Sequence, residues 1–159
     1  MILALDPSST CTGYAVFDGP DNLVDGGLLN PPERLSPLER ITDMCRELDD
    51  IASDFSIDRC VIEITTGKVS RRHTGSGAGL GIYGFAVGVI YERARSLFDG
   101  KIDAIRENVW TAGTKKHNRQ LAATMRFPGY DPDKDKGMDL SDAIALGIWW
   151  YDRQFLNQL

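Results

Sequence analysis

The sequence opens on Ile2-Leu3-Ala4-Leu5-Asp6-Pro7-Ser8-Ser9, and the rest of the fold can be worked out from this segment. Its apolar run predicts a β-strand buried on both faces, as in the middle of a sheet with layers on each side. The run ends on Asp6, and a carboxylate there needs a cation, a hydrogen-bond network or a substrate as its partner. A second interpretation stays open at this point, because Asp-Pro-Ser-Ser is also ordinary turn chemistry.

The length and composition indicate one globular domain. A chain of 159 residues predicts a single domain over residues 1–159, large enough for a hydrophobic core. Its three cysteines include no CxxC pair, which argues against a disulfide framework or a zinc site and favours a reducing compartment. Since we find neither a secretory signal pattern nor a run typical of a membrane span, we expect a cytoplasmic protein without a membrane partner.

The charge is unevenly distributed along the chain. The net charge is −5, yet two windows, 64–91 and 108–130, contain basic residues and no acid. Each window also holds one of the two histidines. A solvated surface would explain either window alone. Two such windows in an acidic chain favour a negatively charged substrate. Their basic residues are Lys68, Arg71, Arg72, Lys115, Lys116, Arg119 and Arg126.

The order of expected elements predicts an α/β fold. Short connections between the first three expected strands indicate an antiparallel meander. Ser36-Pro37-Leu38-Glu39 is typical of a helix start, with Ser at the N-cap, Pro at N1 and Glu at N3. We therefore expect a five-stranded mixed sheet, its first three strands antiparallel, with helices on both faces. The expected strands are 2–6, 13–17, 23–29, 58–64 and 101–105, and the expected helices are 36–55, 77–98, 115–125 and 139–155.

Four glycines share one face of the helix expected over 77–98. They are spaced by four, three and four residues, and together they cost roughly 3–4 kcal/mol of helix stability relative to alanine. We expect the sheet or a partner helix to lie close to that face, since close approach is what glycine permits. The four are Gly77, Gly81, Gly84 and Gly88.

Four carboxylates form the candidate site. Glu63 repeats the pattern of Asp6, because it interrupts an apolar strand. Asp139 and Asp142 are three residues apart at the start of the last expected helix, so they project from one face. Each has an ordinary structural explanation of its own: an exposed strand face for Glu63, and dipole complementation for the two aspartates.

Taken together, the four acids indicate a metal site. Carboxylates without histidine or cysteine companions suit Mg²⁺, with Mn²⁺ as the other candidate. Two such ions about 4 Å apart can clamp the attacking and leaving oxygens of a phosphodiester. We therefore expect two ions per site, because four negative charges gathered in a fold need cations.

Here the chain resembles a known family, the RuvC Holliday-junction resolvases of the retroviral-integrase/RNase H superfamily. Four segments carry the resemblance, in the family's order and over its total length. They are Ile2 to Val16, Val61-Ile62-Glu63, the glycine-containing Gly79-Leu80-Gly81-Ile82-Tyr83-Gly84, and Asp139-Leu140-Ser141-Asp142-Ala143-Ile144-Ala145-Leu146.

The resemblance implies an RNase H-like fold and a metal-dependent homodimer that nicks two strands of a four-way DNA junction. It implies that the catalytic metal ligands are Asp6, Glu63, Asp139 and Asp142. Lys115, Lys116 and Arg119 fall near the positions where the family contacts DNA. In the expected loop 65–76, the residues Lys68, Arg71, Arg72 and His73 are candidates to contact phosphates by charge.

The sequence departs from the family pattern in three places. Ser8 stands where the family usually has glycine, so the turn after Asp6 is where altered geometry is expected. Ile64 stands where glutamine is common. The segment 65–76 lacks the aromatic residue that often wedges into the junction. His73 and His117 are candidate general acids or phosphate ligands, or simply solvated histidines.

Three alternatives stay open. One is a related RNase H-fold nuclease acting on flaps, forks or RNA–DNA hybrids. Another is an ATP-binding domain of the actin/sugar-kinase type, although Pro7-Ser8-Ser9-Thr10 lacks the glycine of its phosphate loop and the chain has no room for a second lobe. The third is a catalytically silent DNA-binding module, against which the four acids argue.

Overall fold

The opening segment forms the central strand of the sheet. In the computed structural model, which describes residues 1–64 and 77–156, the strand order is β3-β2-β1-β4-β5. β1 (Ile2–Pro7) pairs antiparallel with β2 (Thr12–Phe17) and parallel with β4 (Arg59–Ile64). Leu3, Ala4 and Leu5 are fully buried. The prediction of a strand covered on both faces is confirmed.

The remaining strands extend the sheet on either side. β3 (Leu23–Leu29) pairs antiparallel with β2, which completes the meander of the first three strands. β5 (Ile102–Arg106) pairs in parallel with β4. The sheet is therefore mixed and five-stranded, with its first three strands antiparallel, as the sequence predicts.

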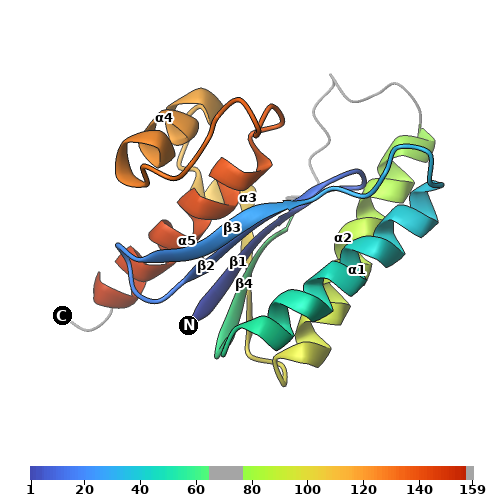
Figure 1. The fold of residues 1–159 in the computed structure, drawn as a ribbon, viewed down its shortest axis with the longest axis horizontal. Coiled ribbons are helices and arrows are strands. Elements are labelled where there is room, and N and C mark those ends of the chain that lie inside the picture. The colour runs from blue at the N-terminus through green and yellow to red at the C-terminus, as the bar shows by residue number, and fades with distance from the viewer. Residues whose placement is uncertain (65–76, 157–159) are drawn as a thin grey trace.

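Helices cover both faces of this sheet (Figure 1). α1 (Pro37–Asp54) and α2 (Gly77–Leu97) pack on the face that carries Leu3 and Leu5. α5 (Asp139–Leu156) packs on the opposite face against Ala4, and the same core includes residues of the short helices α3 (Glu107–Trp110) and α4 (Lys116–Arg126). The alternation along β1 thus supplies both cores. No helix in the described ranges is long and apolar enough to span a membrane.

α1 begins where the sequence predicts. The backbone N–H of Glu39 bonds to the Ser36 side chain, and the Glu39 carboxylate in turn accepts a 2.8 Å bond from the N–H of Ser36. This reciprocal capping box satisfies two helix N-terminal donors. It fixes the point at which the chain leaves the meander and crosses the sheet.

Of the two neighbours expected for the glycine face of α2, the sheet is not the one that covers it. A Cβ atom added at Gly81, Gly84 or Gly88 would have no non-local neighbour within 4 Å. Phe85, beside them, leaves 51% of its surface exposed. The sheet therefore does not cover this face. Gly84 and Gly88 line an open groove between α2 and Cys45 of α1.

Gly13 is required by a close approach between β2 and α5. A Cβ atom at Gly13 would lie 2.0 Å from the backbone oxygen of Asp139, a separation that no side chain tolerates. Asp6 is the residue paired with Gly13 across β1 and β2. Because glycine has no side chain, the start of α5 can lie beside the end of β1.

We predict that Gly13→Ala destabilises the fold by about 2–3 kcal/mol, because the new methyl group has to displace the backbone of α5. Urea unfolding of both proteins measures the difference. Gly129→Ala is the matched control, since a Cβ there meets nothing within 4 Å, and it should change stability by less than about 0.5 kcal/mol. Equal stability of the two variants would contradict this role for Gly13.

Candidate active site

Two of the four predicted acids lie at the carboxyl ends of neighbouring parallel strands. Leu5 of β1 and Ile62 of β4 are partners in the register, so Asp6 and Glu63 are the next residues along their strands. Parallel neighbours in register stand about 4.8 Å apart and point to the same side. The pairing of β1 with β4 therefore brings Asp6 and Glu63 to one edge of the sheet.

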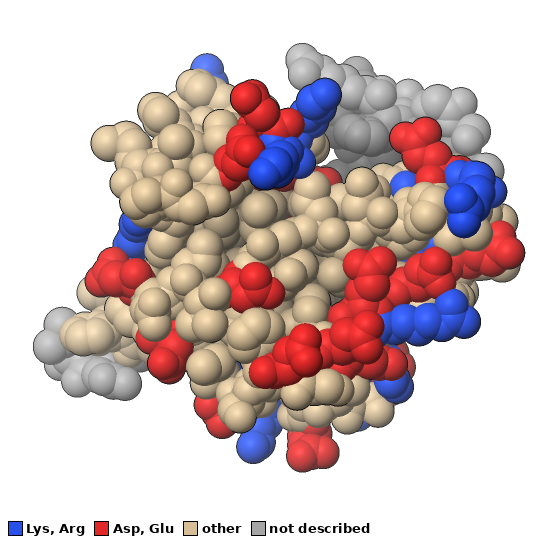
Figure 2. Space-filling model, viewed as in Figure 1, with Lys and Arg blue, Asp and Glu red and all other residues tan. Residues whose placement is uncertain are grey.

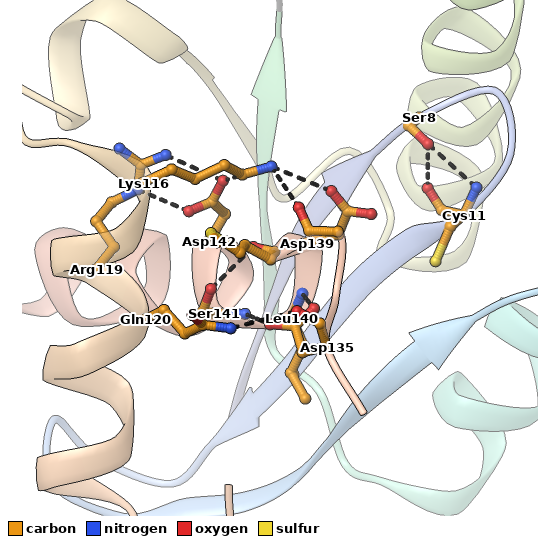
Figure 3. A network of polar contacts seen from close by, with 12 residues as sticks. Ser8, Cys11, Lys116, Arg119, Gln120, Asp135, Asp139, Leu140, Ser141 and Asp142 are labelled. Atoms are coloured by element: carbon orange, nitrogen blue, oxygen red, sulfur yellow. Dashed lines mark hydrogen bonds and ion pairs between the residues drawn. The ribbon is translucent and has the colours of Figure 1, made fainter. Parts of the chain in front are cut away.

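The other two acids come from the first turn of α5. Asp139 is half-buried and Asp142 is 4% exposed. Both raise the pKa of Asp6, so all four carboxylates belong to one electrostatic cluster. We call Asp6, Glu63, Asp139 and Asp142 the acid cluster. Figure 3 shows its α5 half with the cations that face it.

Asp135 anchors the start of α5 and was not predicted as a site residue. Its fully buried carboxylate accepts hydrogen bonds from the backbone N–H groups of Leu140 (3.1 Å) and Ser141 (2.8 Å). The Tyr130 hydroxyl donates a third bond at 2.7 Å. These bonds satisfy helix N-terminal donors and so fix the first turn, with its two aspartates. The sequence feature that could have identified this role is the position of Asp135 shortly before the start of the helix.

Ser8 closes the turn after Asp6 without glycine. Its backbone N–H and its hydroxyl both donate to the carbonyl of Cys11, and its Oγ accepts from the N–H of Cys11 at 3.1 Å. Positive φ values among described non-glycine residues occur only at Asp99, Ala112 and Met138. Ser8 therefore has no left-handed backbone strain, and its side chain takes part in closing the turn.

Burial and mutual repulsion raise the pKa values of three acids of the cluster, Asp6, Glu63 and Asp139. The pKa of Asp6 is raised well above its usual value, first by burial and then by the charges of Glu63, Asp142 and Asp139. Burial raises the pKa of Glu63 to about 7, although a hydrogen bond from Trp110 opposes the shift. Burial also raises the pKa of Asp139, and Lys116 works against that rise.

Two cations of the same chain face the cluster. Lys116 Nζ lies 3.4 Å from Asp139 Oδ1 and 3.2 Å from Asp142 Oδ2, and it donates a 2.8 Å bond to the Gly137 carbonyl. Arg119 forks onto Asp142, with Nε to Oδ1 at 2.6 Å and Nη2 to Oδ2 at 3.0 Å. The sequence placed both cations among the DNA contacts, whereas here they bind the acids.

Trp110 links the two sides of the cluster and was also missed. Its indole N–H donates a 2.7 Å hydrogen bond to Glu63 Oε2. The guanidinium carbon of Arg119 lies 5.0 Å from the centre of the same ring, in cation–π distance. Trp110 is 5% exposed. Trp110 lies in α3, 47 residues along the chain from Glu63, so no short sequence motif indicates that the two side chains meet.

The other predicted contact residues divide into two groups. Lys115 precedes α4 and His117 lies in its first turn, on either side of Lys116 in sequence, and both are exposed. Lys68, Arg71, Arg72 and His73 lie in 65–76, outside the described residues. The structure therefore leaves their predicted phosphate contacts as predictions.

The acid cluster has the ligand chemistry of a hard divalent cation, but its side chains do not have the spacing of a bound one. The acid cluster offers carboxylate oxygens alone, which is the set that Mg²⁺ and Mn²⁺ prefer. Within residues 1–64 and 77–156, no three Asp, Glu, His or Cys side chains are close enough to surround a metal as they lie. Lys116 pairs with both Asp139 and Asp142, and Arg119 pairs with Asp142.

Comparison with solved structures identifies the fold. Thermus thermophilus RuvC in complex with a Holliday junction substrate superposes with a TM-score of 0.69 at 16% identity, over 96% of this chain and 94% of that one. A second T. thermophilus RuvC structure gives 0.64 at 16% identity, over 96% and 95%. The Fowlpox virus resolvase bound to Holliday junction DNA gives 0.52 at 13% identity, over 96% and 99%.

The fold is therefore RNase H-like. Within that class it is the resolvase fold shared by RuvC and the poxvirus enzyme, over nearly the whole length of each chain. No protein-family model and no curated protein matches the sequence.

We predict that Glu63→Gln stabilises the metal-free protein at pH 8. The raised pKa means that the folded state binds a proton at Glu63 more tightly than the unfolded state, so stability is lost as pH rises from about 4.5 to about 7. Glutamine does not ionise, so it removes that loss of stability, which is on the order of 2 kcal/mol. Its side-chain oxygen can still accept the hydrogen bond from Trp110. Thermal unfolding in EDTA at pH 5 and pH 8 measures the difference in stability between the variant and the wild type.

The exposed Glu33→Gln is the control for this charge change. It should shift the melting temperature little at either pH. The interpretation fails if Glu63→Gln melts at or below the wild-type temperature at pH 8.

Proposed function

We propose that this protein is a structure-specific endodeoxyribonuclease that resolves Holliday junctions by metal-dependent paired nicking. The observation that carries the proposal is the acid cluster at the carboxyl edge of a resolvase-type sheet. Structural neighbours solved with junction DNA support branched DNA as the substrate.

The proposed cofactor is Mg²⁺, with Mn²⁺ as a substitute. Asp6, Glu63, Asp139 and Asp142 are the residues that would hold it. A bound divalent ion supplies an activated water and stabilises charge on the leaving oxygen. The chain itself supplies a mobile cation: the Lys116 side chain is 44% exposed and can move from the aspartates to a DNA phosphate.

The charge distribution favours one direction of approach for DNA. α1 contains six acidic and two basic residues, and Figure 2 shows acidic side chains gathered over this helix. Duplex phosphates are repelled there. Lys116 and Arg119 of α4 instead bind acids of the cluster, and the exposed Lys115 precedes them in sequence. We therefore place the scissile phosphate between α4 and the first turn of α5.

Paired nicking requires two sites, and the groove along α2 provides a surface for a second copy of this chain. Gly81, Gly84 and Gly88 leave space there, while Phe85 exposes an aromatic ring. A helix backbone can approach such a face closely, and the aromatic ring can then be buried. This explains glycines that no described part of the same chain covers.

The alternative functions would require different structural features from this protein. A flap, fork or hybrid nuclease of the same fold can act as a monomer, so the α2 groove argues for the junction enzyme. An actin- or sugar-kinase-like ATP site is disfavoured, because the resolvase fold accounts for nearly the whole chain. A silent DNA-binding module would have no use for an acid cluster with raised pKa values.

We predict that the protein with Mg²⁺ nicks a labelled four-way junction symmetrically, and that Asp6→Asn and Glu63→Gln each slow nicking by roughly 100-fold or more while binding persists. Denaturing electrophoresis of both labelled strands measures nicking, and a gel shift measures binding. Glu33→Gln should cut like the wild type. Faster cleavage of flaps or RNA–DNA hybrids than of junctions would favour the alternative nuclease.

We also predict that the protein is a dimer and that Gly88→Glu makes it a monomer with its fold intact. The monomer has room for the new side chain, whereas a packed dimer does not. Sedimentation velocity measures the state, and Gly129→Glu is the control at another open glycine. A monomeric wild type that nicks junctions fully would contradict the dimer.

A further inference from the structure

β3 is an outer strand of the sheet, and its seven residues, Leu23–Leu29, contain neither the proline nor the lysine that often protects a sheet edge. Its backbone pairs with β2 on one side, and the register shifts only near the first residue of β3. On the other side, no backbone group of this strand has a hydrogen-bond partner within residues 1–64 and 77–156. Such an edge offers a row of N–H and C=O groups to a further strand.

An apolar groove lies along one face of this edge. Its volume is about 590 Å³, within the range of binding pockets. Val24, which is 42% exposed, lines it from β3, and Phe127, Pro128 and Leu140 line it from the other side. A Cβ atom at Gly26 would lie 3.2 Å from Cδ1 of Leu140, so alternate residues of β3 face this groove and α5. Apolar side chains that enter the groove are removed from water.

The opposite face of the same edge is acidic. Asp25 accepts a 3.0 Å hydrogen bond from the hydroxyl of Tyr14, which packs on the core that α1 covers. Burial, then Asp25 and then Glu47 of α1 raise the pKa of Tyr14 to about 12, so both carboxylates act on this one hydroxyl. Neither carboxylate forms an ion pair within the described part of the chain. Figure 2 shows acidic side chains gathered over α1, beside the largely uncharged surface over β3.

An added strand therefore meets two different surfaces. Successive side chains of a strand point to opposite faces, so one set lies over the apolar groove and the other lies beside Asp25 and Glu47. Nucleic acid does not suit this edge, because the carboxylates repel phosphates. A second copy of β3 does not suit it either, because it would bring further carboxylates to the acidic face.

We propose that the outer edge of β3 binds an extended segment of a protein partner in which apolar and basic residues alternate. The segment joins the sheet through backbone hydrogen bonds. Its apolar side chains enter the groove, and its lysine or arginine side chains pair with Asp25 and Glu47. This binding surface is separate from the acid cluster and does not depend on nuclease activity.

Peptide binding to the full-length protein tests the proposal. The probe is a capped peptide of alternating lysine and valine, as long as β3, and NMR of the isotope-labelled protein follows the backbone amides. We expect shifts at residues 23–29 and along the groove. A peptide with glutamate in place of each lysine should bind at least about 5-fold more weakly.

Asp25→Asn should weaken binding of the lysine peptide about 3-fold, since asparagine keeps the bond from Tyr14 but has no charge. The exposed Glu33→Gln is the control and should leave binding unchanged. Equal binding of the lysine and glutamate peptides would overturn the proposal, as would shifts centred away from β3 or no shifts with millimolar peptide.

Backbone pairing has a test of its own. Alternate N–H groups of a strand point to the same edge, so N-methylation of every valine blocks one edge of the peptide and N-methylation of every lysine blocks the other. The side chains fix which face of the peptide is turned to the groove, so only one edge can meet β3. One methylated peptide should therefore lose binding about 10-fold or more while the other keeps it.

Two further results would contradict strand addition at this edge. Equal binding of the two methylated peptides would show that no backbone pairing occurs. Dissociation of a dimer by the lysine peptide, measured by sedimentation velocity, would assign the edge to a second copy of this chain instead.

Discussion

Repulsion among four carboxylates is the constraint on which the rest of this structure depends. Asp6 and Glu63 are brought together by the parallel pairing of β1 and β4, and α5 adds Asp139 and Asp142 to the same edge. Charges this close and this poorly solvated oppose folding unless cations or protons offset them. Lys116, Arg119 and the Trp110 N–H supply part of that compensation from within the chain.

The compensation requires accurate backbone placement, which depends on features remote from the chemistry. Gly13 lets α5 approach β2, and Asp135 holds the first turn of α5 by its backbone N–H groups. Both act on the backbone of α5 near its two aspartates. The same backbone features therefore form the fold and position the candidate site, since the sheet pairs two of the acids and the start of α5 presents the other two.

Much of this was predictable, because the signals are local. An apolar run gives β1, a capping box gives the start of α1, and acids that interrupt apolar strands point to Asp6 and Glu63. The pairing of Arg119 with Asp142 was not predictable, since it joins α4 to α5 across 23 residues of sequence. Trp110 and Asp135 were missed for the same reason: their partners are set by packing. Ser8 shows a different limit, because the hydrogen bonds that its hydroxyl makes within the turn are not evident from the sequence.

The most direct test of this account is anomalous diffraction from crystals of the protein soaked in Mn²⁺. The account predicts manganese at the acid cluster, in contact with the carboxylates of Asp6, Glu63, Asp139 and Asp142. Crystals with no ion at the acid cluster would contradict it.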